Sequence, residues 1–207
     1  RSPYAWSVVD EVDCIQWIKN KLKIFNPQTY SPDYLLSIPK GWQKEQFALP
    51  PDFAKQLPFK GVEDLRFFPG WGDPNSEDHW SYAFLWSLDG KPDIDEHFLK
   101  DNLKILYSGL IGRNIVPRKI PKEKLFPVEI NIQNVKTTAG DSKTFAGTVH
   151  MLNYITQTPM TLNLRIHVKD CPDKIHRLLL FEVSPKSPDH PNWLQLDQLN
   201  SDFKCTR

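Results

Sequence analysis

The stretch LNLRIHV at residues 162–168 decides the fold, because apolar and polar side chains alternate along it with a period of two. Successive side chains of a β-strand point to opposite faces of a sheet, so this alternation indicates a strand with one apolar and one polar face. The same alternation occurs at residues 128–133 and 149–151, and an apolar run follows at residues 176–183. The connections are too short for parallel crossovers, so residues 127–184 are expected to form a four-stranded antiparallel meander.

An amphipathic helix is predicted upstream of the meander, over residues 93–111. Leucines recur at helical spacing along one side of it, at Leu99, Leu103, Leu106 and Leu110. Asp93 is the expected N-cap, with Glu96 three residues further on as in a capping box. One side of this helix should therefore pack on the apolar face of the sheet.

The remaining segments complete an α+β domain that covers residues 1–207. Residues 62–68 and 79–88 have the aromatic content and turn boundaries of strands, so residues 62–112 hold two strands and the helix. Prolines make residues 27–58 an irregular segment, with one short strand at 42–49. An N-terminal helix is expected over residues 1–26, and residues 185–207 form a tail with a short helix at 192–199. The fold predicted is a mostly antiparallel sheet of about seven strands, with a closed or half-closed barrel as the alternative.

Composition excludes several classes of function. The formal net charge is only +1, which argues against a nucleic-acid partner. The most apolar stretch, residues 80–88, is far shorter than the ~20 residues that cross a bilayer as a helix. The sequence contains no H-E-x-x-H, G-x-S-x-G, G-x-x-x-x-G-K-[ST] or G-x-G-x-x-G motif, which would indicate a zinc protease, an α/β-hydrolase, a phosphate loop or a dinucleotide-binding fold. It therefore predicts no cofactor, and no motif identifies a catalytic residue.

The cysteines and the start of the chain bear on its compartment. Cys14, Cys171 and Cys205 are widely spaced, so one disulfide with a free thiol and three reduced thiols both fit. The first residues resemble the start of a mature chain, and we therefore expect an extracytoplasmic protein, secreted or periplasmic.

The polar face of the meander is the first candidate site. A tight turn at Gly140-Asp141 would place Asn131, His150 and Arg165 in one row across three strands. Four further side chains should project from the same face, namely Glu129, His167, His176 and Glu182. This set combines an acid, a base and an anion-binding group, although a solvated sheet face with mixed charges is the simpler interpretation.

Two other features of the sequence have both a functional and an ordinary interpretation. Asp73, Asn75 and Glu77 match alternate ligand positions of a calcium loop, but the glycine and the closing glutamate of that loop are missing, and an ordinary turn explains them equally. Residues 80–86 place aromatic side chains on one side of a strand, either as buried core or as an exposed platform for stacking.

These observations favour a non-catalytic domain that binds a small molecule or a protein partner of unknown identity. The alternative is a hydrolase or lyase in which His150 acts as general base, Arg165 holds an anionic intermediate, and Glu129 or Glu182 orients the imidazole.

Overall fold

The chain divides into two compact units, residues 1–31 and 32–207, and the computed structural model describes residues 25–172 and 175–206. Within the described residues, all the helices and strands belong to the second unit. Residues 1–24, which carry most of the predicted N-terminal helix and also Cys14, lie outside the described residues.

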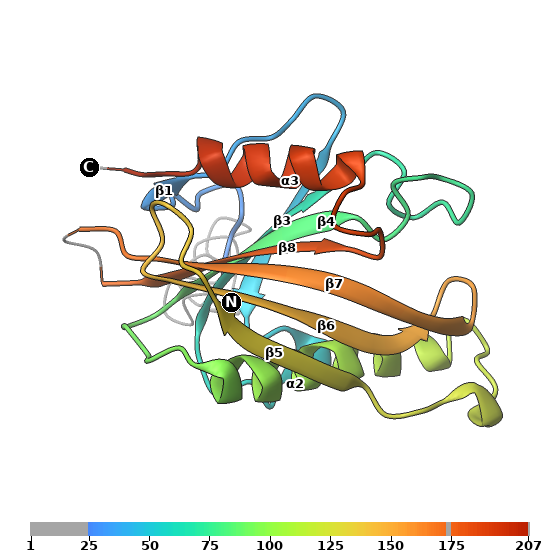
Figure 1. Cartoon of the computed structure of the whole chain (residues 1–207). Helices are drawn as coiled ribbons and strands as arrows, with labels where there is room; N and C mark the ends of the chain where they lie inside the picture. Colours follow the sequence, from blue (N-terminus) through green and yellow to red (C-terminus); the bar gives the residue numbers. More distant parts are fainter. Residues whose placement is uncertain (1–24, 173–174, 207) are drawn as a thin grey trace, which may run out of the picture. The chain divides into compact units, whose positions relative to one another are not determined.

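A seven-stranded antiparallel sheet forms the centre of the second unit, which confirms the predicted α+β fold (Figure 1). The strands are β2 (Gln43–Leu49), β3 (Gly61–Phe67), β4 (Tyr82–Leu88), β5 (Glu129–Val135), β6 (Lys143–Asn153), β7 (Thr158–Lys169) and β8 (Arg177–Ser184). Their order is β2-β3-β4-β8-β7-β6-β5, so the predicted meander β5 to β8 is present and joins the first three strands through β4. Among the described strands, β2 and β5 are the two edges, so this sheet does not close into a barrel.

Helix α2 (Glu96–Ile115) covers one face of the sheet, which we call the α2 face (Figure 1). Its predicted leucine positions 99, 103 and 106 are buried in one core with aromatic residues of β4. The predicted cap is wrong by two residues, since Asp95 caps the helix and its Oδ1 accepts from the Phe98 amide at 2.7 Å. The reason is Ile94, which is 1 % exposed in the same core as Leu99 and so keeps the chain extended up to Asp95.

Helix α3 (Pro191–Asp202) lies on the opposite face, the α3 face (Figure 1). It is the short helix predicted in the tail, and it contributes side chains to the core. Trp193, Leu196 and Leu199 are buried in a second apolar cluster, together with Leu178 and Leu180 of β8. None of the helices in the described part of the chain is long and apolar enough to cross a membrane.

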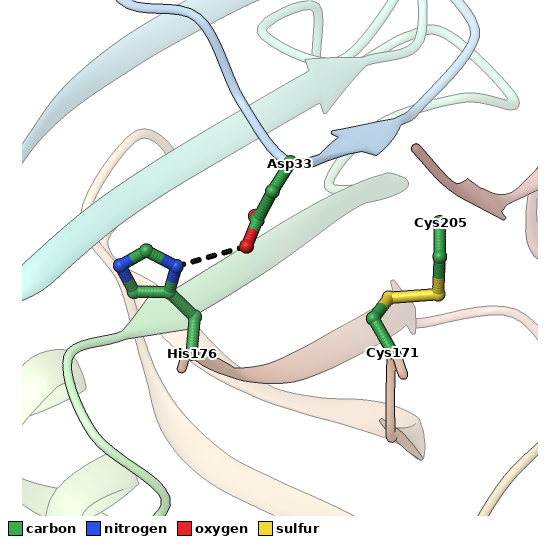
Figure 2. Close-up of a disulfide and its surroundings, with 4 residues drawn as sticks. All are labelled: Asp33, Cys171, His176 and Cys205. Carbon is green, nitrogen blue, oxygen red and sulfur yellow. Dashed lines mark hydrogen bonds and ion pairs between the residues drawn. A yellow bond between two sulfur atoms is a disulfide. The ribbon is translucent and has the colours of Figure 1, made fainter. Parts of the chain in front are cut away.

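A second, two-stranded sheet pairs β1 (Tyr34–Leu35) with β9 (Lys204–Cys205). Beside it, Cys171 and Cys205 form a disulfide that joins the end of β7 to the C-terminal strand (Figure 2). The sequence left open whether a disulfide exists, and this pair answers the question. Asp33 and His176 lie nearby, with 2.9 Å between Oδ2 and Nδ1 (Figure 2).

Candidate functional site

The predicted row of Asn131, His150 and Arg165 does not form. In the observed register, Asn131 lies opposite Thr148, His150 lies between Glu129 and Thr161, and Arg165 lies opposite Ala146. Two registers differ from the prediction. Strands β5 and β6 pair two residues away from it, because their connection spans residues 136–142 instead of a tight turn at 140–141, and β6 and β7 pair four residues away from it. Both shifts are an even number of residues, so each side chain keeps its face and changes only its neighbours.

The members of the predicted polar site are therefore divided between separate environments. Glu129 and Asn131 are exposed, and the Nδ1 atom of His150 lies 3.0 Å from the hydroxyl of Thr161. Arg165 instead forms an ion pair with Asp197 of α3, and its guanidinium lies 4.6 Å from the centre of the Trp193 ring. The chemistry proposed for His150 and Arg165 would need them together, whereas four residues of strand separate them, or about 13 Å.

His167 and Glu182 do meet, in a buried charge network under α3. His167 Nδ1 lies 2.7 Å from Asp141 Oδ2, and His167 Nε2 lies 3.5 Å from Glu182 Oε1. Lys169 completes the network at 2.6 Å from the other oxygen of Asp141. Burial alone lowers the pKa of His167, but the hydrogen bond with Asp141 and the attraction of the Asp141 and Glu182 carboxylates outweigh it and raise this pKa to about 9. Two cations thus balance the charge of two carboxylates, while both oxygens of Glu182 lack a hydrogen-bond partner among the described residues.

The predicted calcium ligands have other partners. The Oδ1 atom of Asp73 accepts a hydrogen bond from the backbone N–H of Asn75 at 2.9 Å, as in an Asx turn. Glu77 forms an ion pair with Lys186. Within residues 25–172 and 175–206, no three His, Cys, Asp or Glu side chains gather closely enough to share a metal ion.

A different site emerges on the α2 face, where a cavity of about 300 Å³ lies between α2 and the first three strands of the sheet. We call it the α2 cavity. Nine aromatic residues line it, and they come from strands β2, β3 and β4, from α2 and from the connecting loops: Phe47, Phe53, Phe67, Trp71, Trp80, Tyr82, Phe84, Tyr107 and Tyr154. The volume lies at the lower end of the range for small-molecule sites, and the predominantly apolar lining is typical of them.

Glu63 of β3 is the exceptional residue of the α2 cavity. The sheet register places it between two aromatic neighbours, Phe47 of β2 and Trp86 of β4. Its side chain is only 3 % exposed, and its Oε2 atom has no hydrogen-bond partner among the described residues. Burial raises the pKa of Glu63 to about 8, and the indole of Trp86 offsets only part of this effect. The carboxyl is therefore protonated at neutral pH and can donate a hydrogen bond.

Two buried tyrosines add hydroxyl groups to the same cavity. The oxygens of Tyr82 and Tyr107 lie 2.7 Å apart, and burial raises the pKa of both phenols. The indole N–H of Trp71 is also buried without a partner in the described part of the chain. An aromatic enclosure with a few inward polar groups can orient a bound molecule as well as enclose it.

The mouth of the α2 cavity is polar and carries two guanidinium groups. Arg113, in the last turn of α2, lies 5.0 Å from the centre of the Phe53 ring, and Arg118 lies 5.1 Å from that of Tyr154. Gln43 and Glu45 of β2 line the cavity as well, and both are exposed. The site thus changes from apolar walls to a charged rim.

The sequence held a signal for this site that our interpretation missed. Glu63, Leu65 and Phe67 are spaced by two, so an acid stands on the same strand face as two apolar side chains. The aromatic ladder at residues 80–86 was assigned either to core or to an exposed platform, and the structure shows that it is buried while three of its rings, Trp80, Tyr82 and Phe84, line the cavity.

Comparisons of the chain with protein-family models, with curated proteins and with solved structures gave no match. A function must therefore be argued from the site itself.

Proposed function

We propose that this protein binds a compact, largely aromatic or alicyclic molecule in the α2 cavity, without transforming it, and that an uncharged acceptor on the molecule receives a hydrogen bond from Glu63. The observation that carries this proposal is the buried carboxyl of Glu63, which faces a cavity with one oxygen unpaired among the described residues.

The energetics of burial support a ligand at this position. A buried polar group without a partner costs about 1–3 kcal/mol, which is large against a total stability of about 5–15 kcal/mol. A ligand carbonyl, ether or hydroxyl oxygen beside Glu63 would supply the missing partner. The surrounding rings would at the same time lose contact with water, which favours binding of an apolar body.

The lining of the cavity favours binding over catalysis. Among the described residues it includes no histidine, lysine, cysteine or serine, so the side chains that most often serve as nucleophiles are missing from these walls. Glu45 is exposed at the mouth, outside the apolar part. The hydrolase or lyase alternative depended on His150 and Arg165, which belong to different rows of the sheet.

An extracytoplasmic location remains part of this proposal. The disulfide between Cys171 and Cys205 supports it, because such bonds persist mainly in oxidising compartments.

The test uses a neutral fluorescent ketone, 6-propionyl-2-(dimethylamino)naphthalene, whose emission reports the polarity around it. We expect saturable binding at one site with a blue shift. Leu110 lines the cavity from α2, so Leu110→Trp should fill the space and abolish binding. The matched control is Leu194→Trp on α3, where the native side chain is 71 % exposed and the ketone should still bind.

Two substitutions of Glu63 then test its role as donor. Glu63→Leu removes the hydrogen bond and should weaken ketone binding about tenfold, since one such bond contributes about 1 kcal/mol or slightly more. Glu63→Gln keeps an N–H donor and should stay within about threefold of the natural protein. Equal binding by Leu110→Trp and the natural chain would contradict the proposal.

A further inference from the structure

We infer that the ligand of the α2 cavity is an organic monoanion, an aromatic or alicyclic carboxylate whose charged group lies between Arg113 and Arg118 at the mouth. This inference rests on the proposed function and adds the chemical class of the ligand.

The arginines of the described residues fall into two groups. Arg66, Arg165 and Arg177 each form an ion pair with an aspartate, namely Asp64, Asp197 and Asp170. Arg113 and Arg118 have no carboxylate within ion-pair distance in the part of the chain that the structure describes, and both line the α2 cavity. The two guanidinium groups without an acidic partner are thus the two at the candidate site.

The local contacts hold both groups at the rim. Arg113 lies over Phe53 and Arg118 over Tyr154, and the Nε atom of Arg118 donates to Asn114 Oδ1 at 3.0 Å. A ring contact of this kind engages the plane of a guanidinium and leaves its edge able to form the paired hydrogen bonds that a carboxylate accepts.

The charges around the cavity favour an anion. Glu45 is the only acidic residue at the mouth among the described residues that line the cavity, and it opposes two arginines. Glu63, at the apolar end, is uncharged below a pH of about 8 and does not repel an anion there. Arg113 lies in the last turn of α2, where a positive charge interacts favourably with the helix dipole. Arg118 lies beyond the end of the helix, so the dipole does not account for its position.

The experiment compares two probes that share one ring system, 2-naphthoate and the uncharged 2-naphthamide, by titration calorimetry at pH 7. The natural chain should bind the carboxylate at least ~10-fold more tightly than the amide, as expected for charge-assisted hydrogen bonds. The double substitution Arg113→Gln/Arg118→Gln should remove this preference and change amide binding less than ~3-fold. Lys104→Gln is the control, because it removes an exposed positive charge from the same helix away from the cavity.

The outcomes separate this inference from the proposed function. If both probes bind equally well, or if the double variant keeps the preference for naphthoate, the inference is overturned while the cavity remains a binding site. If neither probe nor the neutral ketone binds the natural chain, the proposed function fails and the inference fails with it.

Discussion

Two glutamates are buried on opposite faces of the same sheet, and their surroundings differ. Glu182 of β8 lies on the α3 face beside His167, within a network that also contains Asp141 and Lys169. Glu63 of β3 lies on the α2 face among aromatic rings, with no cation paired to it among the described residues and with an open cavity in front of it. The first carboxylate is matched by positive charges, whereas the second is kept neutral by burial.

This difference separates a structural arrangement from a candidate site. A buried carboxylate with a cation beside it has its charge balanced within the fold, even though both oxygens of Glu182 lack a hydrogen-bond partner among the described residues. A buried acid that lacks a partner and borders empty space is costly in the free protein, and a ligand can recover that cost. Substitutions and changes of pH should therefore affect the two faces in different ways.

The largest expected effect is on the α3 face. His167→Ala would leave Asp141 and Glu182 buried without the imidazolium between them, and should lower the free energy of unfolding by about 3–5 kcal/mol at pH 7. Glu63→Gln, which replaces a neutral acid by a neutral amide, should change it by less than about 1 kcal/mol at pH 5. Urea denaturation measures the free energy of unfolding of both variants. If His167→Ala lowers it by less than about 1 kcal/mol, the two faces do not differ in the way proposed.

The next effect is the dependence of stability on pH. The pKa of Glu63 is raised from 4.5 to about 8 in the folded chain, so between these values the folded state holds a proton that the unfolded state has lost. Stability should therefore fall as the pH rises through this window, by about 1.4 kcal/mol per pH unit from this one group.

Glu63→Gln should abolish that slope between about pH 5 and pH 6.5. Above about pH 6.5 a second loss should persist in the variant, because the raised pKa of His167, about 9, makes its stabilisation disappear as the pH rises toward that value. Identical pH profiles for the natural chain and Glu63→Gln would show that Glu63 ionises normally.

The smallest effect compares arginines of the two faces. Arg165→Ala loses both the ion pair with Asp197 and the contact with Trp193, and should destabilise the fold by about 1–2 kcal/mol. Arg118→Ala loses a ring contact but no ion pair, and should cost about 0.5–1 kcal/mol while weakening naphthoate binding. Thermal unfolding of the two variants shows which one loses more stability. A larger loss of stability for Arg118→Ala than for Arg165→Ala would show that Arg118 mainly stabilises the fold.

The sequence was sufficient for the fold because local patterns determine it. The alternation at residues 162–168 and the leucine spacing of α2 depend only on which side of an element is buried, so they predict the meander and the helix directly. Burial of Ile94 displaced the helix cap, since a core contact overrides the preference of a nearby aspartate.

The site was harder to predict because it depends on contacts between distant segments. The predicted polar row was wrong in two registers, that of β5 with β6 and that of β6 with β7. The connection at residues 136–142 also turns Asp141 inward, where it meets His167 and Lys169. The α2 cavity brings Glu63, Tyr107 and Arg118 together from β3, α2 and a following loop, and no local pattern specifies that meeting. The sequence alone indicates one feature of this site, which is that Glu63 shares a strand face with the apolar side chains of Leu65 and Phe67.

The most direct test of this account is the titration of the Glu63 carboxyl carbon by NMR, with and without the neutral ketone. We predict a midpoint near pH 8 in the free protein, and a higher one when the ketone is bound, because the protonated form donates to the ligand. A midpoint near the ordinary 4.5, or one that the ketone leaves unchanged, would contradict the assignment of Glu63 as the group that holds the ligand.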